Sequence, residues 1–234
     1  MSAVVYLIPT VLHEGRTECL PLYLLEAVRQ CSVLFVENLR TARRYLKLLA
    51  RDIVIDDFEW FEMKEVNAET MAAFRSKIAE EKIIGIISEA GCPGVADPGQ
   101  QLVTIAQQMA VPVKPLVGPN SILLALMASG MNGQQFQFVG YLPIEVADRA
   151  KAIKSLEQES RQKNCTQIFI ETPYRNNQLM ETLTKTCLPQ TRICVAVDLT
   201  AETERVQTKT AQQWKTAMPH LHKHPAIFLL YAGA

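Results

Sequence analysis

Short runs of apolar, mostly β-branched residues alternate with segments of helical periodicity in the first half of the chain. Four of these runs are predicted as strands, at residues 4–8, 33–36, 83–87 and 113–116, and each is followed by a segment suited to a helix. Because the runs are continuously apolar, both faces of each strand should be buried, as in a parallel sheet covered by helices. The pattern predicts an open α/β domain.

The second half of the chain is less regular. Strands are predicted at 136–140, 167–171, 192–198 and 226–231, and helices at 147–163, 178–187 and 211–218. This mixture predicts a mixed sheet. Because the segment 117–120 is rich in turn residues, we expect two α/β domains, 1–117 and 118–234.

Composition narrows the class of protein. The chain has 234 residues, 48% of them apolar, with 24 basic and 24 acidic side chains, which excludes disordered, collagen-like and coiled-coil proteins. Its apolar runs are far shorter than the roughly 20 residues of a membrane span, and residues 1–9 lack the features of a signal peptide, so a cytoplasmic location is expected. The six cysteines form no C-x-x-C pair, which argues against a disulfide framework or a zinc site.

Two turn-rich loops each connect a predicted strand to a helix. The loop at 88–99 holds three of the ten glycines, and its Asp97 can cap the helix that Pro98 begins. The loop at 117–121 is V-G-P-N-S. Ligands of open parallel sheets bind where such loops gather, although glycine and proline also serve simply to make tight turns. Neither loop matches G-x-G-x-x-G or G-x-x-x-x-G-K-[ST], which disfavours dinucleotide and P-loop sites.

Basic residues are concentrated on one face of a predicted helix, opposite Ala42, Leu46 and Leu49. They are Arg40, Arg43, Arg44, Lys47 and Arg51, and an acidic stretch follows them. This stripe could follow a phosphate backbone or could be an ordinary solvated face.

Other candidate residues carry weaker signals. Arg175 follows a predicted strand end and could grip an anionic substrate or be a surface charge at a helix start. His220, His222 and His224 are expected to form a solvated turn, because no carboxylate or cysteine cluster accompanies them, so no metal is expected. Cys92 is expected to be a small turn residue in preference to a nucleophile.

The loop after the third predicted strand carries a resemblance to a known family. Residues 87–99, I-S-E-A-G-C-P-G-V-A-D-P-G, resemble the S-D-A-G-T-P-x-x-x-D-P-G signature of the tetrapyrrole (corrin/porphyrin) methylase superfamily. By motif the chain is most similar to ribosomal RNA small subunit methyltransferase I type enzymes. Further similar stretches occur in the expected order, at 7–10, 37–40, 115–121, 138–143, 169–175 and 198–200.

The resemblance implies two α/β domains with S-adenosylmethionine in the cleft between them, usually in a homodimer. It implies cofactor binding by Pro9, Glu89, Ala90, Gly91, Cys92, Pro93, Val95, Asn120, Ser121, Glu171 and Ala196. A sulfonium methyl group is already activated, so no metal is required and the enzyme mainly aligns the nucleophile. A ribose 2′-hydroxyl would benefit from a base or a cation. Glu171, Arg175 and Asp198 are the candidate catalytic residues.

The chain departs from the pattern in several motifs. After Pro9 and Thr10 it has V-L-H-E-G-R where the RNA enzymes have P-x-G-N-L-x-D, and it has V-D-L-T-A at 197–201 where they have R-E-L-T-K, losing two cationic positions. Their E-D-T-R and S-P-H-R are replaced by E-N-L-R and T-P-Y-R, and the extra C-terminal segment of longer members is missing.

The resulting prediction is an S-adenosylmethionine-dependent methyltransferase of ribosomal RNA, of the ribose 2′-O, small-subunit type. The residues expected to receive the substrate are Arg40, Arg43, Arg44, Lys47 and Arg175. The alternatives are a methyltransferase of a small molecule such as a tetrapyrrole, and a diverged non-catalytic paralogue that keeps the fold.

Overall fold

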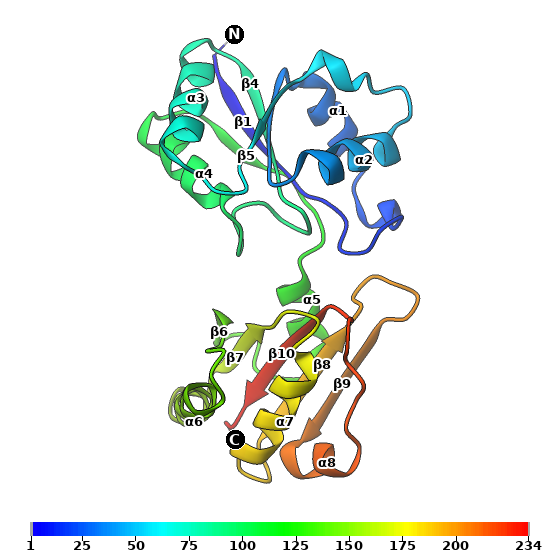
Figure 1. The fold of residues 1–234 in the computed structure, drawn as a ribbon, viewed down its shortest axis with the longest axis vertical. Coiled ribbons are helices and arrows are strands. Elements are labelled where there is room, and N and C mark those ends of the chain that lie inside the picture. The colour runs from blue at the N-terminus through cyan, green and yellow to red at the C-terminus, as the bar shows by residue number, and fades with distance from the viewer. Residues whose placement is uncertain (1, 234) are drawn as a thin grey trace. The chain divides into compact units, whose positions relative to one another are not determined.

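The computed structural model describes residues 2–233 and divides into two compact units, Met1–Asn120 and Ser121–Ala234 (Figure 1). Each unit is built on its own five-stranded sheet with helices packed against it. The fold class expected from the sequence, two α/β domains with a parallel sheet first and a mixed sheet second, is confirmed.

The N-terminal unit has an all-parallel sheet in the strand order β3-β2-β4-β1-β5. Its strands are β1 (Val4–Ile8), β2 (Val33–Val36), β3 (Glu59–Glu62), β4 (Ile83–Ile87) and β5 (Val113–Pro115). Its helices are α1 (Tyr23–Gln30), α2 (Leu39–Leu49), α3 (Ala68–Ala79) and α4 (Gly99–Gln108), with 3-10 turns η1 (Thr17–Cys19) and η2 (Ile55–Asp57).

Helices cover both faces of this sheet (Figure 1), which explains why its central strands are apolar throughout. All four residues of β2 are buried: Leu34 and Val36 pack with α1 and α2, whereas Val33 and Phe35 pack with α3 and α4. The sheet is therefore the middle layer of three, and the loops at the carboxyl ends of its strands gather at one edge.

The C-terminal unit has a mixed sheet in the order β6-β7-β10-β8-β9, in which only β6 and β7 pair in parallel. Its strands are β6 (Phe136–Tyr141), β7 (Thr166–Ile170), β8 (Arg192–Val197), β9 (Arg205–Thr210) and β10 (Ala226–Tyr231). Its helices are α5 (Ser121–Ser129), α6 (Val146–Lys163), α7 (Asn176–Thr186) and α8 (Ala211–Thr216).

One face of this second sheet carries the main core of the unit. Phe169 and Phe228 stack there with their ring centroids 6.1 Å apart, and Trp214 of α8 packs into the same cluster. Helices α6 and α7 contribute to that cluster, while α5 contacts β8, β9 and β10.

The main differences from the sequence expectations are two strands and one helix end, beside shifts of one or two residues at the ends of other elements. Strands β3 and β9 were not predicted, because both are edge strands with exposed, charged residues. Helix α2 ends at Leu49, so Arg51 lies beyond the helix and not on its basic face.

Among residues 2–233, no helix has both the length and the hydropathy needed to span a bilayer.

Candidate functional site

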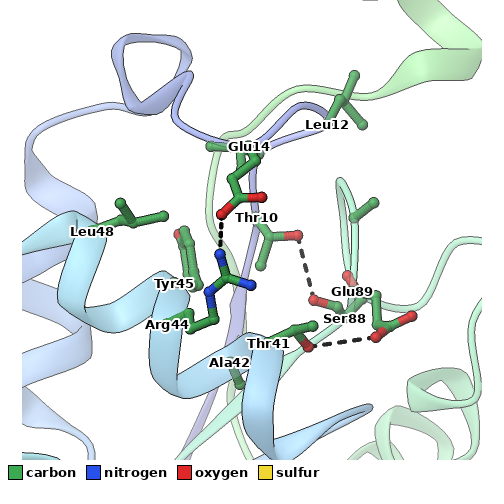
Figure 2. Close-up of a pocket in the computed structure, with 12 residues that line it drawn as sticks. Thr10, Leu12, Glu14, Thr41, Ala42, Arg44, Tyr45, Leu48, Ser88 and Glu89 are labelled. Carbon is green, nitrogen blue, oxygen red and sulfur yellow. Dashed lines mark hydrogen bonds and ion pairs between the residues drawn. The ribbon is translucent and has the colours of Figure 1, made fainter. Parts of the chain in front are cut away.

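A pocket of about 190 Å³ opens in the N-terminal unit, where the chain leaves β1 and β4 beside helix α2 (Figure 2). Its walls come from three segments that are distant in sequence. They are Thr10, Val11, Leu12 and Glu14 after β1; Thr41, Ala42, Arg44, Tyr45 and Leu48 on α2; and Ser88, Glu89 and Ala90 after β4. The loop that carries the family signature therefore forms one wall of a real cavity.

Three hydrogen bonds hold these walls together. The Thr10 amide donates to the Gly91 carbonyl at 2.8 Å, and the Thr10 hydroxyl donates to the Ser88 carbonyl at 3.3 Å. The buried Tyr45 hydroxyl donates to the Pro9 carbonyl at 2.6 Å, and burial raises the pKa of this phenol. The end of β1 is thus fixed to both the signature loop and α2.

The signature loop has a backbone that needs glycine and an internal carboxylate. Gly91 and Gly94 have φ values of +76° and +83°, a region that L-residues rarely adopt. The Asp97 carboxylate accepts the Gly94 amide at 2.8 Å and the Gly99 amide at 2.7 Å. Burial raises the Asp97 pKa, and the two amide bonds oppose that rise. Asp97 therefore bonds the first residue of α4, as expected, although the residue directly before the helix is Pro98.

Glu37, directly after β2, was missed as a site residue. Its Oε2 accepts the Glu89 amide at 2.9 Å, and the Thr41 hydroxyl donates to Glu89 Oε1 at 3.4 Å. Burial raises the Glu37 pKa, repulsion from Glu89 and Asp97 adds to the rise, and the amide bond opposes it. The sequence feature that could have identified Glu37 is its position at the carboxyl end of a central strand.

The loop after β5 closes against the same region of the unit. A Cβ atom on Gly118 would collide with Pro9 Cβ, so only glycine fits there. Cys92 Sγ lies 3.5 Å from the Pro119 carbonyl oxygen. Burial raises the pKa of Cys92, which disfavours the thiolate that a nucleophile would need.

These contacts place most of the expected cofactor residues. Those in the N-terminal unit lie in the loops after β1, β4 and β5; they are Pro9, Glu89, Ala90, Gly91, Cys92, Pro93, Val95 and Asn120. Pro93 is buried, whereas Val95 is exposed. Ser121, Glu171 and Ala196 belong to the C-terminal unit, where Ala196 is a buried residue within β8.

The basic residues of α2 are exposed, and Ala42 and Leu46 of the same helix are buried as expected. Arg44 forms an ion pair with Glu14 (Figure 2), and the Arg43 guanidinium lies 5.3 Å from the Trp60 ring centroid. The ammonium of Lys47 donates to the Ile53 carbonyl at 2.6 Å. These basic side chains line a shallow groove that shares Glu14, Arg44 and Leu48 with the pocket.

A second polar cluster lies in the C-terminal unit, around the end of β7. Glu171 follows that strand, and its side chain is 1% exposed. Its Oε1 accepts the Thr172 amide at 2.6 Å and Arg175 Nη2 at 2.7 Å. Its Oε2 is buried and has no hydrogen-bond partner. The cation of Arg175, expected to receive substrate, is therefore held by Glu171.

Asp198 follows β8 at the same edge of the sheet. Ile227 of β10 pairs with both Ile170 and Ala196, so the ends of β7 and β8 flank the start of β10. The buried Asp198 carboxylate lies 2.7 Å from Nδ1 of His224. Sequence reasoning placed His224 in a solvated turn and missed this contact, which joins residues 26 positions apart.

Within residues 2–233, no group of three or more His, Cys, Asp or Glu side chains is arranged to hold a metal ion.

Several curated proteins are similar in sequence to this chain. Ribosomal RNA small subunit methyltransferase I of Micromonospora olivasterospora is 32% identical over 174 residues, which are 74% of this chain and 52% of that protein. The chain thus spans about half the length of this curated relative.

Two solved structures share the fold over nearly the whole chain. The methyltransferase CobJ has a TM-score of 0.64 at 16% identity, covering 98% of this chain and 93% of that one. Uroporphyrin-III C-methyl transferase from Thermus thermophilus, solved with S-adenyl homocysteine, has a TM-score of 0.57 at 16% identity, covering 99% and 97%. At these identities the structures establish the fold alone.

The family itself is established by a family model that spans most of the chain. The model for Tetrapyrrole (Corrin/Porphyrin) Methylases matches residues 14–214. This range includes α2, the signature loop, Glu171 and Asp198, and it ends before His224. The chain is therefore a member of the family of Tetrapyrrole (Corrin/Porphyrin) Methylases.

Proposed function

We propose that this protein is an S-adenosylmethionine-dependent methyltransferase that methylates a ribose 2′-hydroxyl of small-subunit ribosomal RNA. The observation that carries the proposal is the pocket walled by the family's signature loop at Ser88–Ala90, with an exposed basic helix beside it. The names of the curated relatives support the RNA substrate. The ligand of the Thermus thermophilus structure supports the cofactor.

The residues of the pocket suit part of such a cofactor. Ser88 is 4% exposed, lines the pocket, and has a buried hydroxyl without a hydrogen-bond partner. A Cβ on Gly91 would come within 3.2 Å of Leu12 Cδ2, so the bare glycine keeps this wall open. At about 190 Å³ the cavity is smaller than the roughly 300–1,000 Å³ of sites that enclose a whole ligand. We therefore propose that this cavity holds only a part of the cofactor.

Acidic groups in and next to the signature loop favour a cationic ligand. Glu37 and Glu89 are joined through the Glu89 amide, and Asp97 is close enough to raise the Glu37 pKa. S-Adenosylmethionine supplies an electrophilic methyl group on a sulfonium cation. A negative potential from these carboxylates attracts that cation more strongly than the neutral thioether left after transfer.

The groove beside the pocket has the chemistry to bind RNA. Arg40, Arg43, Arg44 and Lys47 lie on the exposed face of one helix, and cations in such an array neutralise successive phosphates. We propose that Arg175, Glu171 and Asp198 of the C-terminal unit take part in the same reaction. We also propose that Ser121, Glu171 and Ala196 contribute to cofactor binding, and that the enzyme works in the cytoplasm as a homodimer.

Calorimetric titration with S-adenosylmethionine and S-adenosylhomocysteine tests the proposal first. We expect both ligands to bind with micromolar affinity. Gly91→Trp should abolish this binding, because the indole would occupy the space between Leu12 and Pro119. Small ribosomal subunits from a strain lacking the gene are then incubated with labelled cofactor. Label in the RNA, released as a 2′-O-methyl nucleoside, is the expected result. If the protein binds the cofactor but methylates a tetrapyrrole and not RNA, the proposed RNA substrate is wrong. If it binds no cofactor, the proposed methyltransferase function is wrong.

A further inference from the structure

Three aromatic side chains gather on the surface of the C-terminal unit, and we call them the aromatic row. Tyr174 is 68% exposed, and His220 and His222 are exposed as well. The ring centroids of Tyr174 and His222 lie 5.9 Å apart, and those of His220 and His222 lie 6.5 Å apart. The ring planes are inclined at 71° and 53°, so the rings are not stacked on one another. Their faces remain available to a third ring.

The two histidines of the row are carried by an anchored segment between α8 and β10. Leu221, which stands between them, is fully buried in the core of the unit. Its amide donates to Asn177 Oδ1 of α7 at 2.8 Å. Because the side chain and the amide of Leu221 are both held, His220 and His222 are kept at the surface on either side of it.

The loop that carries Tyr174 is joined to that segment. The Lys223 amide donates to the Pro173 carbonyl at 3.0 Å, and the Asn176 side-chain amide donates to the His224 carbonyl at 2.7 Å. The aromatic row is therefore set on backbone that is fixed before any ligand arrives. A ligand that binds there pays little for ordering the loops.

A surface hollow of about 260 Å³ extends the aromatic row on the side of His220, which lines it. Its other walls are Asn177, Met180, Glu181, Met218 and Pro219. The Glu181 carboxylate is paired with the Lys185 ammonium at 3.5 Å, which balances its charge. The walls thus combine apolar and polar groups, which suits a nucleobase, because a base has an apolar face and a hydrogen-bonding edge.

The same surface carries a cation. Lys223, directly after His222, is exposed and has a φ of +67° in the turn that the His224 amide closes with the Leu221 carbonyl at 3.2 Å. Rings on which bases stack, together with cations for the phosphates, are the features that bind single-stranded nucleic acid. The bases of a duplex already stack on each other, so this surface favours a single strand.

We propose that the aromatic row and Lys223 bind a single-stranded segment of the RNA substrate. The bases stack on Tyr174, His220 and His222, and the Lys223 ammonium pairs with a phosphate. This proposal rests on the proposed function, because the RNA is the substrate proposed above. It needs only residues of the C-terminal unit, and it gives a role to the histidine segment that the methyl-transfer chemistry leaves unused.

Fluorescence anisotropy with the full chain gives the first test, using a labelled single-stranded RNA dodecamer of mixed sequence and the same sequence as a duplex. Tyr174→Ala and His222→Ala should weaken binding of the single strand by about 5–100-fold, the usual effect of removing a ring on which a base stacks. Binding of the duplex should stay unchanged. Tyr174→Phe and His222→Phe keep a flat ring and should keep the wild-type affinity. Tyr141→Ala is the matched control, because Tyr141 is also exposed but lies on β6, outside the row.

The dependence of binding on salt separates the rings from the cations. Stacking involves no counterion, so Tyr174→Ala should lower the affinity and leave the slope of log affinity against log salt unchanged. Lys223→Gln should lower that slope by about 0.7, the value for one phosphate contact of a single strand. A changed slope in Tyr174→Ala would show that the loss is not a loss of stacking and would contradict the proposal.

The wild-type protein gives a test that does not depend on variant stability. In carbon–proton spectra of histidine-labelled protein, the ring signals of His220 and His222 should shift as the dodecamer is added. His220→Phe and His222→Phe assign these signals. Ring signals that do not move at saturating RNA would overturn the proposal. Adenosine monophosphate that binds as tightly as the dodecamer would also overturn it, because the occupant would then be a free nucleotide.

The outcomes distinguish this surface from the proposed function. Methylation of RNA by the wild type, with wild-type RNA affinity in Tyr174→Ala and His222→Ala, would overturn the aromatic row and leave the function intact. Binding of RNA that depends on the rings, in a protein that binds no S-adenosylmethionine, would overturn the methyltransferase and support the row. A protein that binds S-adenosylmethionine but no RNA would overturn both the RNA substrate and the row.

Discussion

The hydroxyl of Tyr45 donates a 2.6 Å hydrogen bond to the carbonyl of Pro9, joining helix α2 to the residue that follows β1. Both residues are buried, and Tyr45 also lines the pocket beside the signature loop (Figure 2). One hydrogen bond therefore connects the helix with the basic face to the segment that leads into the proposed cofactor site.

Replacing Tyr45 by Phe should weaken both stability and cofactor binding. The buried Pro9 carbonyl would lose its donor, which costs about 1–3 kcal/mol of unfolding free energy. Denaturant unfolding and calorimetry with S-adenosylmethionine measure the two effects. Tyr6→Phe is the control, because the Tyr6 hydroxyl bonds the Gln30 side chain at 3.0 Å away from the pocket. Equal loss of cofactor affinity in both variants would contradict a local role for Tyr45.

Gly118→Ala should damage the N-terminal unit, because the new methyl would collide with Pro9 Cβ. Overpacking of this kind costs about 1–3 kcal/mol, and displacement of Pro9 should weaken cofactor binding. Gly133→Ala is the matched control, since nothing lies within 4 Å of its added Cβ. Thermal unfolding and cofactor titration of both variants decide the matter. An alanine at 118 with wild-type stability would show that this turn is not tightly packed.

Removing cations from α2 should weaken RNA binding in a salt-dependent manner. In the Arg40→Ala and Arg43→Ala double variant, the slope of log affinity against log salt should fall by about 0.7–0.9 for each phosphate that is no longer neutralised. Lys151→Ala, an exposed charge on α6, is the control and should leave the slope unchanged. Filter binding at several salt concentrations gives the slopes. If the double variant kept the wild-type slope, the RNA would bind to another surface.

Thiol labelling should separate the six cysteines by burial. Cys19 is exposed and should react first, whereas Cys31, whose pKa is raised to about 12 by burial, should react only after unfolding. Cys92 is partly exposed and lies in the signature loop, so it should react slowly, and S-adenosylhomocysteine should slow it further. Cys19→Ser and Cys92→Ser assign the two phases. A Cys92 rate unaffected by saturating ligand would place the ligand elsewhere.

Glu37 should make the free energy of unfolding depend on pH. Its pKa is raised by burial, so the folded state binds the proton more tightly than the unfolded chain does. Its contribution to stability is therefore largest in acid and is lost as pH rises through the raised pKa. Glu37→Gln keeps an oxygen for the Glu89 amide but cannot ionise. The unfolding free energy of the wild type minus that of Glu37→Gln should fall from about pH 4 to about pH 7. A rising difference would show that the amide bond outweighs burial.

Local sequence signals were strong where strands are buried on both faces. The runs at β1, β2 and β4 contain only apolar residues and glycine, so their bounds were predicted correctly. Strands β3 (E-W-F-E) and β9 (R-V-Q-T-K-T) lie at the edges of their sheets, where exposure permits polar and charged residues. Their hydrophobic pattern is therefore too weak to identify them.

The candidate site was predictable only in part for a related reason. The signature loop could be located from its residue types and its place after a buried strand. The hydrogen bonds of Tyr45 with Pro9 and of His224 with Asp198 join residues 36 and 26 positions apart. Such pairings are set by tertiary packing, and a single sequence without its relatives gives no periodicity that would reveal them.

The order of strands in the second sheet has a consequence for synthesis of the chain. Strand β10 lies in the middle of that sheet, between β7 and β8, yet it is the last strand to be made. The strands before it cannot complete the sheet until residues 226–231 have emerged from the ribosome. The N-terminal unit contains all five of its own strands within its first 115 residues, so it can fold during translation while the C-terminal unit waits for its last strand.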